Sequence, residues 1–586
     1  MCGIFGYIGT KQDASTSILE GLKSLEYRGY DSWGIALQKK DGTVYITKHP
    51  GKIGNAKAPD IQSSIGIGHT RWATHGAISR ENAHPHTDCT GDVVLVHNGI
   101  VENFSKLKTE LKAKGHTFKS ETDSEVIAHL IEEFLTSSQD LGNVMKQTKQ
   151  AIDGMNAVIV LFPKHHAFYI IKNGSPIVIG KASDGYYIAS DASAILPHTK
   201  EVYFLEDGES AKLTTDALTI FDTQDQEKQP TFISLPYDAQ MATKGDYEYF
   251  MLKEIAEQPT VLRIISKSGY EDIQKAATLI KNAYGTYLIG CGTASYAALA
   301  GTYLFSKIAK RHVNHSIGSE FSYLVDFLTD KSLVIPLSQS GETIDTISAV
   351  DSAKQKNAQI LAITNSIGST LYRKADVNIL LHAGPEKAVA STKAYTAKIA
   401  YLYLLAHEMD GSYDKGIDHL DTAIKAISTL IDHQNDIERI VNGIKDSTSI
   451  FVLGRGVSYP AALESALKIK EVSYVHAEGF AAGELKHGVL ALVEKGTPII
   501  LFNPHDETYK DTISAAYEVR ARGGYVIGLS DTNHEAYDEF IHIPDCGDCT
   551  VIPNVVVAQL MGYYLALAKG FDPDKPRNLA KSVVVK

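Results

Sequence analysis

The chain is 586 residues long, and at roughly 100–200 residues per domain this length predicts three or four domains. Its 44% hydrophobic and 22% charged residues are ordinary for a globular protein and exclude a disordered or collagen-like chain. The net charge of −12 argues against a basic surface for nucleic acid. We therefore predict no nucleic-acid partner and expect any anionic ligand to be held by a local site.

Cysteine content and apolar segments bear on the compartment. Five cysteines in 586 residues are too few for a disulfide scaffold and predict a reducing compartment, so we expect a cytoplasmic protein. No basic segment followed by an apolar one opens the chain, which argues against a secretory signal. The longest apolar stretch, about 555–568, contains Gln559 and is too short to span a bilayer. We predict a buried helix there and no membrane association.

The first 222 residues combine short β-branched runs with helical patterns. The runs are bounded by Gly, Asn, Asp or Pro and predict strands at 93–96, 157–160 and 177–179. Apolar residues at helical spacing predict helices over 15–25 and 124–135. We therefore predict a mixed α+β domain over 1–222. Residues 223–246 lose this periodicity and are the expected linker.

From about residue 247 onward, short apolar strands alternate with long helical segments, which predicts parallel sheets with helices on both faces. The strand and glycine turn at 287–295 are echoed at 451–458, and the helix near 342 is echoed near 507, about 165 residues later in both cases. These matches predict an internal duplication. We therefore expect a first domain, a second domain and a polar tail, at 247–425, 426–571 and 572–586.

A hydroxyl-rich turn follows the predicted strand at 333–337. Residues 338–343 (SQSGET) open a helix, so backbone N–H groups and hydroxyls converge at its positive end, where a phosphate monoester is stabilised without Lys or Arg. An ordinary helix cap is the alternative, and a second hydroxyl cluster at 389–393 (VASTK) favours the phosphate site. The corresponding turn of the second copy, 503–508 (NPHDET), lacks both serines and the glycine. We predict one sugar-phosphate site per chain, in the first copy.

Other motifs argue against a cofactor or a metal. The glycine turn at 290–295 lacks the third glycine of a dinucleotide fingerprint and the acidic residue expected about 20 positions later. Cys546 and Cys549 form a single pair, whereas a structural zinc site needs four ligands. We therefore predict no cofactor and no metal site.

Charged side chains in the second copy offer acid–base chemistry. Lys468 and Glu471 are three apart in a predicted helix and share one face. Spacing alone favours a surface ion pair of little energetic weight. The alternative is a carboxylate base beside a cation that stabilises an enolate. His487 is a further candidate for proton transfer near neutral pH.

The N-terminus carries a candidate nucleophile. A small residue follows Met1, so its removal is expected to leave an N-terminal Cys2. An α-amine with a pKa of about 8 beside its own thiol pairs a base with a nucleophile. A buried structural cysteine is the alternative. In 97–99 (HNG), the Asn98 side chain and the Gly99 N–H form a candidate oxyanion pair, although Asn-Gly is more often only a turn.

Longer motifs resemble known families. The first half resembles the class II, N-terminal-nucleophile glutamine amidotransferases, through residues 1–7 (MCGIFGY), 27–32 (YRGYDS), 68–76 (GHTRWATHG), 82–86 (NAHPH), 97–99 (HNG) and 121–123 (ETD). The remainder resembles a pair of sugar-isomerase (SIS) domains, through 338–343, 389–393, 476–478 (HAE), 483–488 (GELKHG) and 576–583 (PRNLAKSV). In this order, the two halves resemble the glutamine:fructose-6-phosphate aminotransferases (isomerising). The resemblance covers essentially the whole chain.

The resemblance implies a fold and a reaction. The fold is an α+β N-terminal-nucleophile hydrolase domain followed by two α/β parallel-sheet SIS domains. The reaction converts fructose 6-phosphate and L-glutamine to glucosamine 6-phosphate and L-glutamate, the first step of hexosamine synthesis. It requires glutamine hydrolysis, channelling of ammonia, amination and ketose-to-aldose isomerisation.

The resemblance also implies roles around the nucleophile. Cys2 would attack the glutamine carboxamide to form a thioester, with Asn98 and the Gly99 N–H as the oxyanion hole. Arg71 would bind the glutamine carboxylate, and Asp123 would bind its α-ammonium group. The other implied residues are Thr74 and His75 lining the site, Arg28 supporting the nucleophile, and Trp72 gating an ammonia channel.

In the isomerase half, Lys581 would form a Schiff base with the ketose carbonyl. Glu471 would move a proton between C1 and C2, and Lys468 would stabilise the intermediate. His487 of a neighbouring subunit would open the sugar ring, so a homodimer is the expected minimum. The residues implied to hold the sugar phosphate are Thr293, Ser338, Gln339, Ser340, Thr343, Val389, Ser391 and Ala580.

Two other functions stay open from the sequence. Pocket size cannot be read from a sequence, so amination of another phosphorylated ketose is one alternative. A sugar-phosphate-sensing module with a vestigial glutaminase is the other, and it predicts that Cys2→Ala leaves every activity unchanged.

Overall fold

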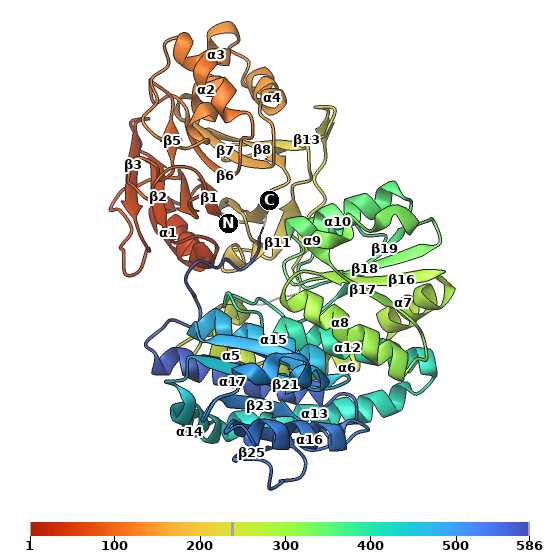
Figure 1. Ribbon diagram of the computed structural model, residues 1–586. Coiled ribbons are helices and arrows are strands. Elements are labelled where there is room, and N and C mark those ends of the chain that lie inside the picture. The colour runs from red at the N-terminus through yellow and green to blue at the C-terminus, as the bar shows by residue number, and fades with distance from the viewer. Residues whose placement is uncertain (1, 236–238, 584–586) are drawn as a thin grey trace. The chain divides into compact units, whose positions relative to one another are not determined.

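The computed structural model describes residues 2–235 and 239–583. Among these residues the chain forms two compact units. The first contains the residues up to Thr243 together with Ser582 and Val583, and the second spans Lys244–Lys581. The folds of both are drawn in Figure 1.

Two antiparallel sheets form the first unit. In the described residues their strand orders are β15-β11-β9-β10-β1-β4-β2-β3 and β14-β13-β12-β8-β7-β6-β5. The strands of the first sheet are β1 (Gly3–Gly9), β2 (Ser32–Gln38), β3 (Val44–Pro50), β4 (Ile65–Arg71), β9 (Val178–Ala182), β10 (Gly185–Ala189), β11 (Glu201–Phe204) and β15 (Ile233–Ser234). Those of the second are β5 (His86–Thr87), β6 (Val94–Gly99), β7 (Asn156–Phe162), β8 (Ala167–Asn173), β12 (Ser210–Leu213), β13 (Leu218–Phe221) and β14 (Glu227–Lys228).

Helices cover the outer faces of these sheets. Side chains alternate along β6, so Val94 and Val96 pack between the sheets while Val93 and Leu95 face outward. The outward side chains pack against helices on that face, and Figure 1 shows α1 on the opposite side of the unit. The helices are α1 (Ala14–Leu25), α2 (Phe104–Ala113), α3 (Glu125–Ser137) and α4 (Leu141–Ala151), with the short turns η1 (Glu26–Arg28), η2 (Pro163–His165) and η3 (Ala192–Ala194). The four layers confirm the predicted α+β class.

The segment 223–246, predicted as a linker, contributes to both sheets. Its strand β14 pairs with β13, and its strand β15 pairs with β11. The boundary between the two compact units falls between Thr243 and Lys244. The short turn η4 (Ala239–Ala242) precedes that boundary.

Two parallel sheets form the second unit. Their strand orders are β17-β16-β18-β19-β20 and β22-β21-β23-β24-β25, so the same topology occurs twice in the described chain. The first copy contains β16 (Gly285–Gly290), β17 (Asn314–Ile317), β18 (Ser332–Ser338), β19 (Gln359–Thr364) and β20 (Val377–Leu380). The second contains β21 (Ser449–Gly454), β22 (His476–Ala481), β23 (Pro498–Phe502), β24 (Tyr525–Ser530) and β25 (Glu539–His542). The repeated topology confirms the predicted duplication.

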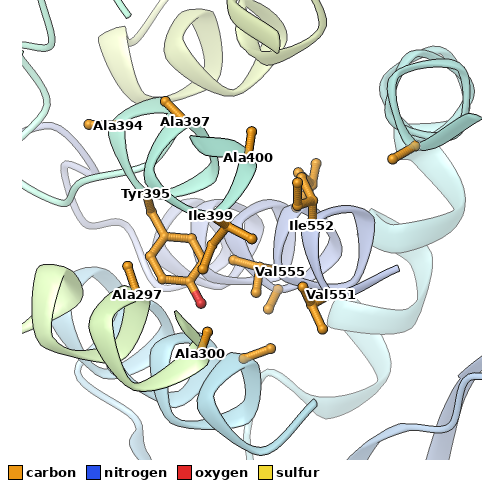
Figure 2. Packing of buried hydrophobic residues seen from close by; sticks show 14 of the residues in the cluster. Ala297, Ala300, Ala394, Tyr395, Ala397, Ile399, Ala400, Val551, Ile552 and Val555 are labelled. Atoms are coloured by element: carbon orange, nitrogen blue, oxygen red, sulfur yellow. The ribbon is translucent and has the colours of Figure 1, made fainter. Parts of the chain in front are cut away.

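The helices of both copies share one hydrophobic core. Tyr395 and Ile399 of α12 pack against Ala297 of α8 and Val555 of α17, as Figure 2 shows. The helices of the first copy are α5 (Phe250–Ala256), α6 (Gln258–Ser268), α7 (Tyr270–Asn282), α8 (Thr293–Lys307), α9 (Gly318–Phe321), α10 (Ile344–Gln355), α11 (Thr370–Lys374), α12 (Lys393–Asp410) and α13 (Tyr413–Asp432), with η5 (Val325–Phe327). The later ones are α14 (Gln434–Ile444), α15 (Ser458–Ser473), α16 (Tyr509–Arg520) and α17 (Val551–Ala568), with η6 (Ala482–His487) and η7 (Val489–Leu492).

The most apolar helix lies inside this core. The segment Gly547–Ala568, which contains α17, is long and apolar enough to cross a membrane, but 83% of its most apolar window is buried in the protein. This confirms the helix predicted at 555–568. The cytoplasmic location stays a prediction.

Hydrogen bonds within the second unit hold the tail after α17 in place. The Asp574 carboxylate accepts the N–H groups of Phe250 and Met251 at the start of α5, each at 2.8 Å. The Asp574 carbonyl accepts the Val389 N–H at 3.0 Å. Further along, the Arg577 N–H donates to the Tyr474 hydroxyl oxygen at 2.7 Å. The tail therefore follows a fixed path before it reaches Lys581.

Candidate active sites

Cys2 lies at the start of β1, next to the end of β4. Because β1 and β4 are antiparallel with Gly3 opposite Thr70, Cys2 reaches the turn that follows β4. The Trp72 N–H donates to Cys2 Sγ at 3.3 Å, and the thiol lies 3.6 Å from the Trp72 carbonyl oxygen. Burial raises the pKa of the Cys2 thiol, so attack on an amide needs a nearby base. The expected base is the Cys2 α-amine after removal of Met1, which lies outside the described residues.

Two side chains hold the backbone of the nucleophile. The Cys2 carbonyl oxygen accepts from Arg28 Nε at 3.3 Å and from Asn98 Nδ2 at 3.0 Å. Arg28, in η1, is itself held by an ion pair with Asp191 at 3.3 Å, and the Tyr27 hydroxyl donates to the same carboxylate oxygen at 2.6 Å. Arg28 and Asn98 therefore both bind the backbone carbonyl of the nucleophile's own residue.

A buried histidine orients the Asn98 amide. His69 Nε2 lies 3.0 Å from the His97 carbonyl oxygen and 3.1 Å from Asn98 Oδ1. Both partners are acceptors, so Nε2 carries the proton. Burial lowers the pKa of His69 to about 3, so the ring is neutral. With its Oδ1 fixed in this way, Asn98 directs Nδ2 toward the Cys2 carbonyl. His69 is a positioning residue that sequence reasoning did not single out.

Gly99 ends β6 in a conformation that excludes other residues. Its φ is +136°, and a Cβ there would lie 1.9 Å from the Met155 carbonyl oxygen. The fold therefore requires glycine at the position implied to supply the second oxyanion donor.

Opposite charges flank the Cys2 thiol. Arg71 ends β4 and Asp123 precedes α3, and both interact electrostatically with Cys2. The Arg71 guanidinium donates to backbone carbonyls of the 75–77 turn, one of them at 3.2 Å. An Asp123 carboxylate oxygen accepts the Val101 N–H at 2.8 Å. A cation and an anion near one thiol match the carboxylate and the ammonium group of a free amino acid.

The loop after β4 carries the remaining predicted residues of this site. Trp72 presents its ring edge-on to Tyr30, with the ring centres 5.5 Å apart. His75 contacts Phe104 of α2 in the same manner at 5.2 Å, and Thr74 is exposed. The structure therefore places Trp72 against the nucleophile, whereas Thr74 and His75 lie farther along the loop.

In the second unit, the predicted phosphate loop lies at a topological switch point. Strand β17 lies on one side of β16 and β18 on the other, and open α/β sheets bind ligands where the order reverses. Thr293 starts α8 after β16, and Ser338 and Thr343 bound the loop from β18 to α10. The Gly341 N–H donates to Ser338 Oγ at 2.9 Å. Gly341 has a φ of +66°, and a Cβ there would lie 2.0 Å from Ser369 Oγ.

Gln339 and Ser340 complete this loop. The Gln339 carbonyl accepts the Asn365 N–H at 3.3 Å, which joins the loop to the one after the adjacent strand β19. Ser340 Oγ accepts the Glu342 N–H at 3.1 Å. Thr343 is the N-cap residue of α10. The N-terminus of a full-length helix and several hydroxyls therefore meet at one edge of the sheet.

In the second copy, a side chain of the protein itself binds the equivalent helix start. An Asp506 carboxylate oxygen accepts the Thr508 N–H at 2.8 Å and the Thr508 hydroxyl at 2.6 Å. This carboxylate would repel a phosphate at the start of α16.

Lys468 and Glu471 form a buried pair on α15. Lys468 Nζ donates to Glu471 at 2.6 Å and to Thr293 Oγ1 at 3.0 Å. The Lys468 side chain is 1% exposed and that of Glu471 is 20% exposed, so the surface ion pair that spacing favoured is wrong. One turn earlier, Glu464 lies 3.5 Å from Lys468 and accepts the Thr293 hydroxyl at 3.2 Å. Burial raises the pKa of Glu464 to about 8, so this carboxyl holds its proton near neutral pH.

Lys581 is buried although it lies in the tail. Its Nζ is 2.6 Å from Glu386, and the two side chains are 4% and 0% exposed. The same carboxylate accepts the Ser391 hydroxyl at 3.0 Å and the N–H groups of Thr392 and Ala394 at 2.9 and 3.1 Å. Although burial alone would raise it, the ammonium of Lys581 and these donors hold the pKa of Glu386 well below its usual range.

Lys398 of α12 connects the two lysine–carboxylate pairs. It is fully buried and interacts electrostatically with Glu386, Lys581, Glu464 and Lys468. Burial lowers the pKa of Lys398 to about 8. Lys468, Glu471 and Lys581 therefore belong to one buried cluster of lysines and carboxylates, built from α12, the segment before it, α15 and the tail.

Family models match parts of both units, and curated relatives match the whole chain. The SIS domain model matches residues 279–408 and 443–568, and the glutamine amidotransferase domain model matches residues 69–197. The chain is 43% identical to the glutamine–fructose-6-phosphate aminotransferase (isomerizing) of Pyrococcus horikoshii and 42% identical to that of Thermococcus kodakarensis, with 100% of each chain covered. The chain belongs to the glutamine–fructose-6-phosphate aminotransferase (isomerizing) family.

A solved structure supports this assignment for the second unit. The C-terminal domain of glucosamine-fructose-6-phosphate aminotransferase from Francisella tularensis matches 57% of this chain at 32% identity, with a TM-score of 0.54 and 99% of that chain covered. The aminotransferase fold is thus the predicted one, a glutamine amidotransferase domain followed by two SIS domains.

Three predicted residues of this aminotransferase lie outside the hydrogen-bonded clusters described above. Val389 contacts the tail through Asp574, and Ala580 is half-buried directly before Lys581. His487 is exposed at the end of η6, whereas Glu471 lies on α15.

Sequence reasoning missed several charged residues of this aminotransferase site. Glu386, Lys398 and Glu464 are all buried and face the predicted lysines. One signal was available for Glu464, because Glu464 and Lys468 are four apart on a predicted helix. Glu386 and Lys398 lie in no recognisable motif, because the lysine partners they meet in the fold are far away in the sequence.

Proposed function

We propose that this protein transfers the amide nitrogen of L-glutamine to fructose 6-phosphate and isomerises the product, giving glucosamine 6-phosphate and L-glutamate. The observation that carries the proposal is that one chain holds a charge-flanked N-terminal thiol in its first unit, and in its second unit both a phosphate-type loop and a buried lysine–carboxylate cluster that contacts Thr293. Neither site alone accounts for the full-length similarity to this family.

The glutaminase step follows from the groups around Cys2. The thiolate attacks the carboxamide carbon, and the α-amine takes the thiol proton. Asn98 Nδ2 and the Gly99 N–H donate to the oxyanion, while Arg71 and Asp123 bind the carboxylate and the ammonium group of the substrate. The C–N bond then breaks and ammonia leaves with the proton. Water hydrolyses the thioester to glutamate.

Ammonia must reach the sugar without mixing with water. In neutral solution it is protonated to ammonium, which has no free electron pair and cannot attack a carbonyl. We therefore propose direct transfer, with Trp72 as the gate. Its backbone contact with Cys2 Sγ couples the Trp72 loop to the nucleophile.

The sugar reaction uses the buried lysines. The loop containing Ser338 and Thr343 binds the phosphate, and Lys581 condenses with the C2 carbonyl, with loss of water. Glu386 holds the Lys581 side chain in place, and its negative charge balances the protonated imine that replaces the ammonium group. Ammonia then replaces the lysine at C2 and leaves the sugar imine.

Isomerisation follows at the Lys468–Glu471 pair. Glu471 removes a proton from C1 and returns it to C2, which converts the imine to a 2-amino aldose. Lys468, 2.6 Å from Glu471, stabilises the enolamine charge. We further propose that His487 of a second copy opens the sugar ring, which makes the functional unit a homodimer. The partners are thus L-glutamine, fructose 6-phosphate and a second copy of this chain.

Product formation from a panel of ketose phosphates tests this function. We expect an amino-sugar phosphate from glutamine and fructose 6-phosphate, and at least about 10-fold less from tagatose 6-phosphate or fructose 1-phosphate, because a misplaced hydroxyl or phosphate leaves buried polar groups unpaired. Mass spectrometry of the products, with a glutamine-free control, provides the measurement. Preference for another ketose would replace fructose 6-phosphate as the substrate, and no amination at all would reject the proposal.

A further inference from the structure

A second cluster of reactive side chains lies in the first unit, outside the residues assigned to glutamine. It consists of Cys89, His116, His129 and Glu132, whose ligand atoms lie within 4.8 Å of one another. Cys89 lies between β5 and β6, and His116 lies between α2 and α3. His129 and Glu132 are three apart on α3 and therefore share one face. Three segments of the chain thus converge on one point.

The distances in this cluster fit a tetrahedral zinc ion. Metal–ligand distances of 2.0–2.3 Å place neighbouring N and O ligands about 3.3 Å apart and S and N ligands about 3.6 Å apart. Glu132 Oε2 lies 2.9 Å from His116 Nδ1 and 3.1 Å from His129 Nδ1. Cys89 Sγ lies 3.9 Å from His116 Nδ1 and 3.5 Å from His129 Nδ1. Both histidines therefore present the same ring nitrogen to the sulfur and the carboxylate.

The other nitrogen of each ring faces a further carboxylate. His116 Nε2 lies 3.2 Å from Glu133, and His129 Nε2 lies 3.6 Å from Glu125. Histidines that bind metals commonly donate their second N–H to a carboxylate, which fixes the tautomer and directs the free nitrogen to the ion. The His116 ring shows that arrangement, whereas His129 Nε2 faces the Glu125 carboxylate at 3.6 Å without a hydrogen bond in the described structure.

An ion-pair cluster without metal is the competing explanation. It accounts for the two histidines around Glu132, and it leaves Cys89 Sγ a hydrogen bond from the Thr117 N–H at 3.5 Å. It does not explain why the sulfur also lies within 4 Å of both Nδ1 atoms. With zinc, the thiolate and the carboxylate balance the charge of the ion, and all four ligand atoms are used. Cys89 is exposed, which gives the ion a path into the site.

We propose that Cys89 Sγ, His116 Nδ1, His129 Nδ1 and Glu132 Oε2 bind a structural Zn²⁺ ion. Four protein ligands close the coordination shell, which is typical of structural sites and leaves no position for a substrate. The ion would join the β5–β6 turn and the α2–α3 connection to α3. The sequence predicted no metal site, because Cys546 and Cys549 form a single pair and these four ligands follow no regular spacing.

Metal content and Co²⁺ spectra of the full-length protein test this site. We expect about one Zn²⁺ per chain after equimolar zinc is added to chelator-treated protein, and a rise in Tm on zinc addition. Co²⁺ should give the absorption of a tetrahedral site with a thiolate charge-transfer band. Cys89→Ser should abolish that band, whereas Cys2→Ala and Cys546→Ser, which remove other thiols, should retain it. Glu133→Gln should weaken zinc affinity by about 10-fold or more.

Three outcomes would overturn the proposal. They are folded wild-type protein that takes up no equimolar Zn²⁺, a Co²⁺ spectrum without a thiolate band, and a band that is lost in Cys2→Ala or Cys546→Ser but retained in Cys89→Ser. The first two need only the wild-type protein, so they decide the question even if Cys89→Ser fails to fold.

Discussion

Replacing Cys2 by alanine is expected to lower glutamine hydrolysis by about 10³-fold or more, because loss of a nucleophile removes the covalent pathway itself. Alanine keeps a small residue at position 2, so processing of Met1 is unaffected. The backbone contacts from Arg28 and Asn98 are also retained, since both are made to the Cys2 carbonyl. Release of glutamate, followed with and without fructose 6-phosphate, measures the effect.

The second unit supplies the control for this variant. Because Lys244–Lys581 forms a compact unit with its own core, fructose 6-phosphate should raise the Tm of the Cys2→Ala protein as much as that of the wild type. Unchanged glutamate release from Cys2→Ala would contradict the assignment of the nucleophile and would favour the vestigial-glutaminase alternative.

Replacing Lys581 by arginine is expected to abolish amino-sugar formation while leaving glutaminase activity within about twofold of wild type. Arginine keeps a positive charge beside Glu386, whereas alanine would leave a buried carboxylate without its cation and cost about 3–5 kcal/mol. A guanidinium group does not form an imine at neutral pH, because it stays protonated. The variant therefore separates the chemistry of Lys581 from its contribution to stability.

Reductive trapping provides the direct measurement. Borohydride added to wild-type protein with fructose 6-phosphate should reduce the imine and leave one hexose phosphate on the peptide that contains Lys581. The adduct should be absent in Lys581→Arg and present in Lys425→Arg, a matched change at an exposed lysine of α13. Trapping at another lysine, such as Lys398, would reassign the Schiff base.

Most of the secondary structure near the sites could be predicted from the sequence. The helix expected over 124–135 is α3, and the turn at 338–343 does join a strand to a helix, because hydrophobic periodicity and capping residues are local signals. Helical spacing also predicted that Lys468 and Glu471 share one helix face. Their burial was not predictable, since it depends on α8 packing over that face of α15, where Thr293 contacts Lys468.

The site residues that could not be predicted from the sequence are those whose partners are far away along the chain. Glu386 meets Lys581 across 195 positions, and neither lies in a pattern that suggests an ion pair. His129 and Glu132 share a helix face, but Cys89 and His116 come from separate loops. Only the packing of these segments brings such groups together.

Nitrogen tracing tests most directly whether one chain couples both sites. The protein is given glutamine labelled with nitrogen-15 in its amide, fructose 6-phosphate and an excess of unlabelled ammonium. Direct transfer predicts glucosamine 6-phosphate that carries the labelled nitrogen at C2, formed in a one-to-one ratio with glutamate. Amino sugar that carries mainly the unlabelled nitrogen, or glutamate release with no amino sugar, would contradict the account.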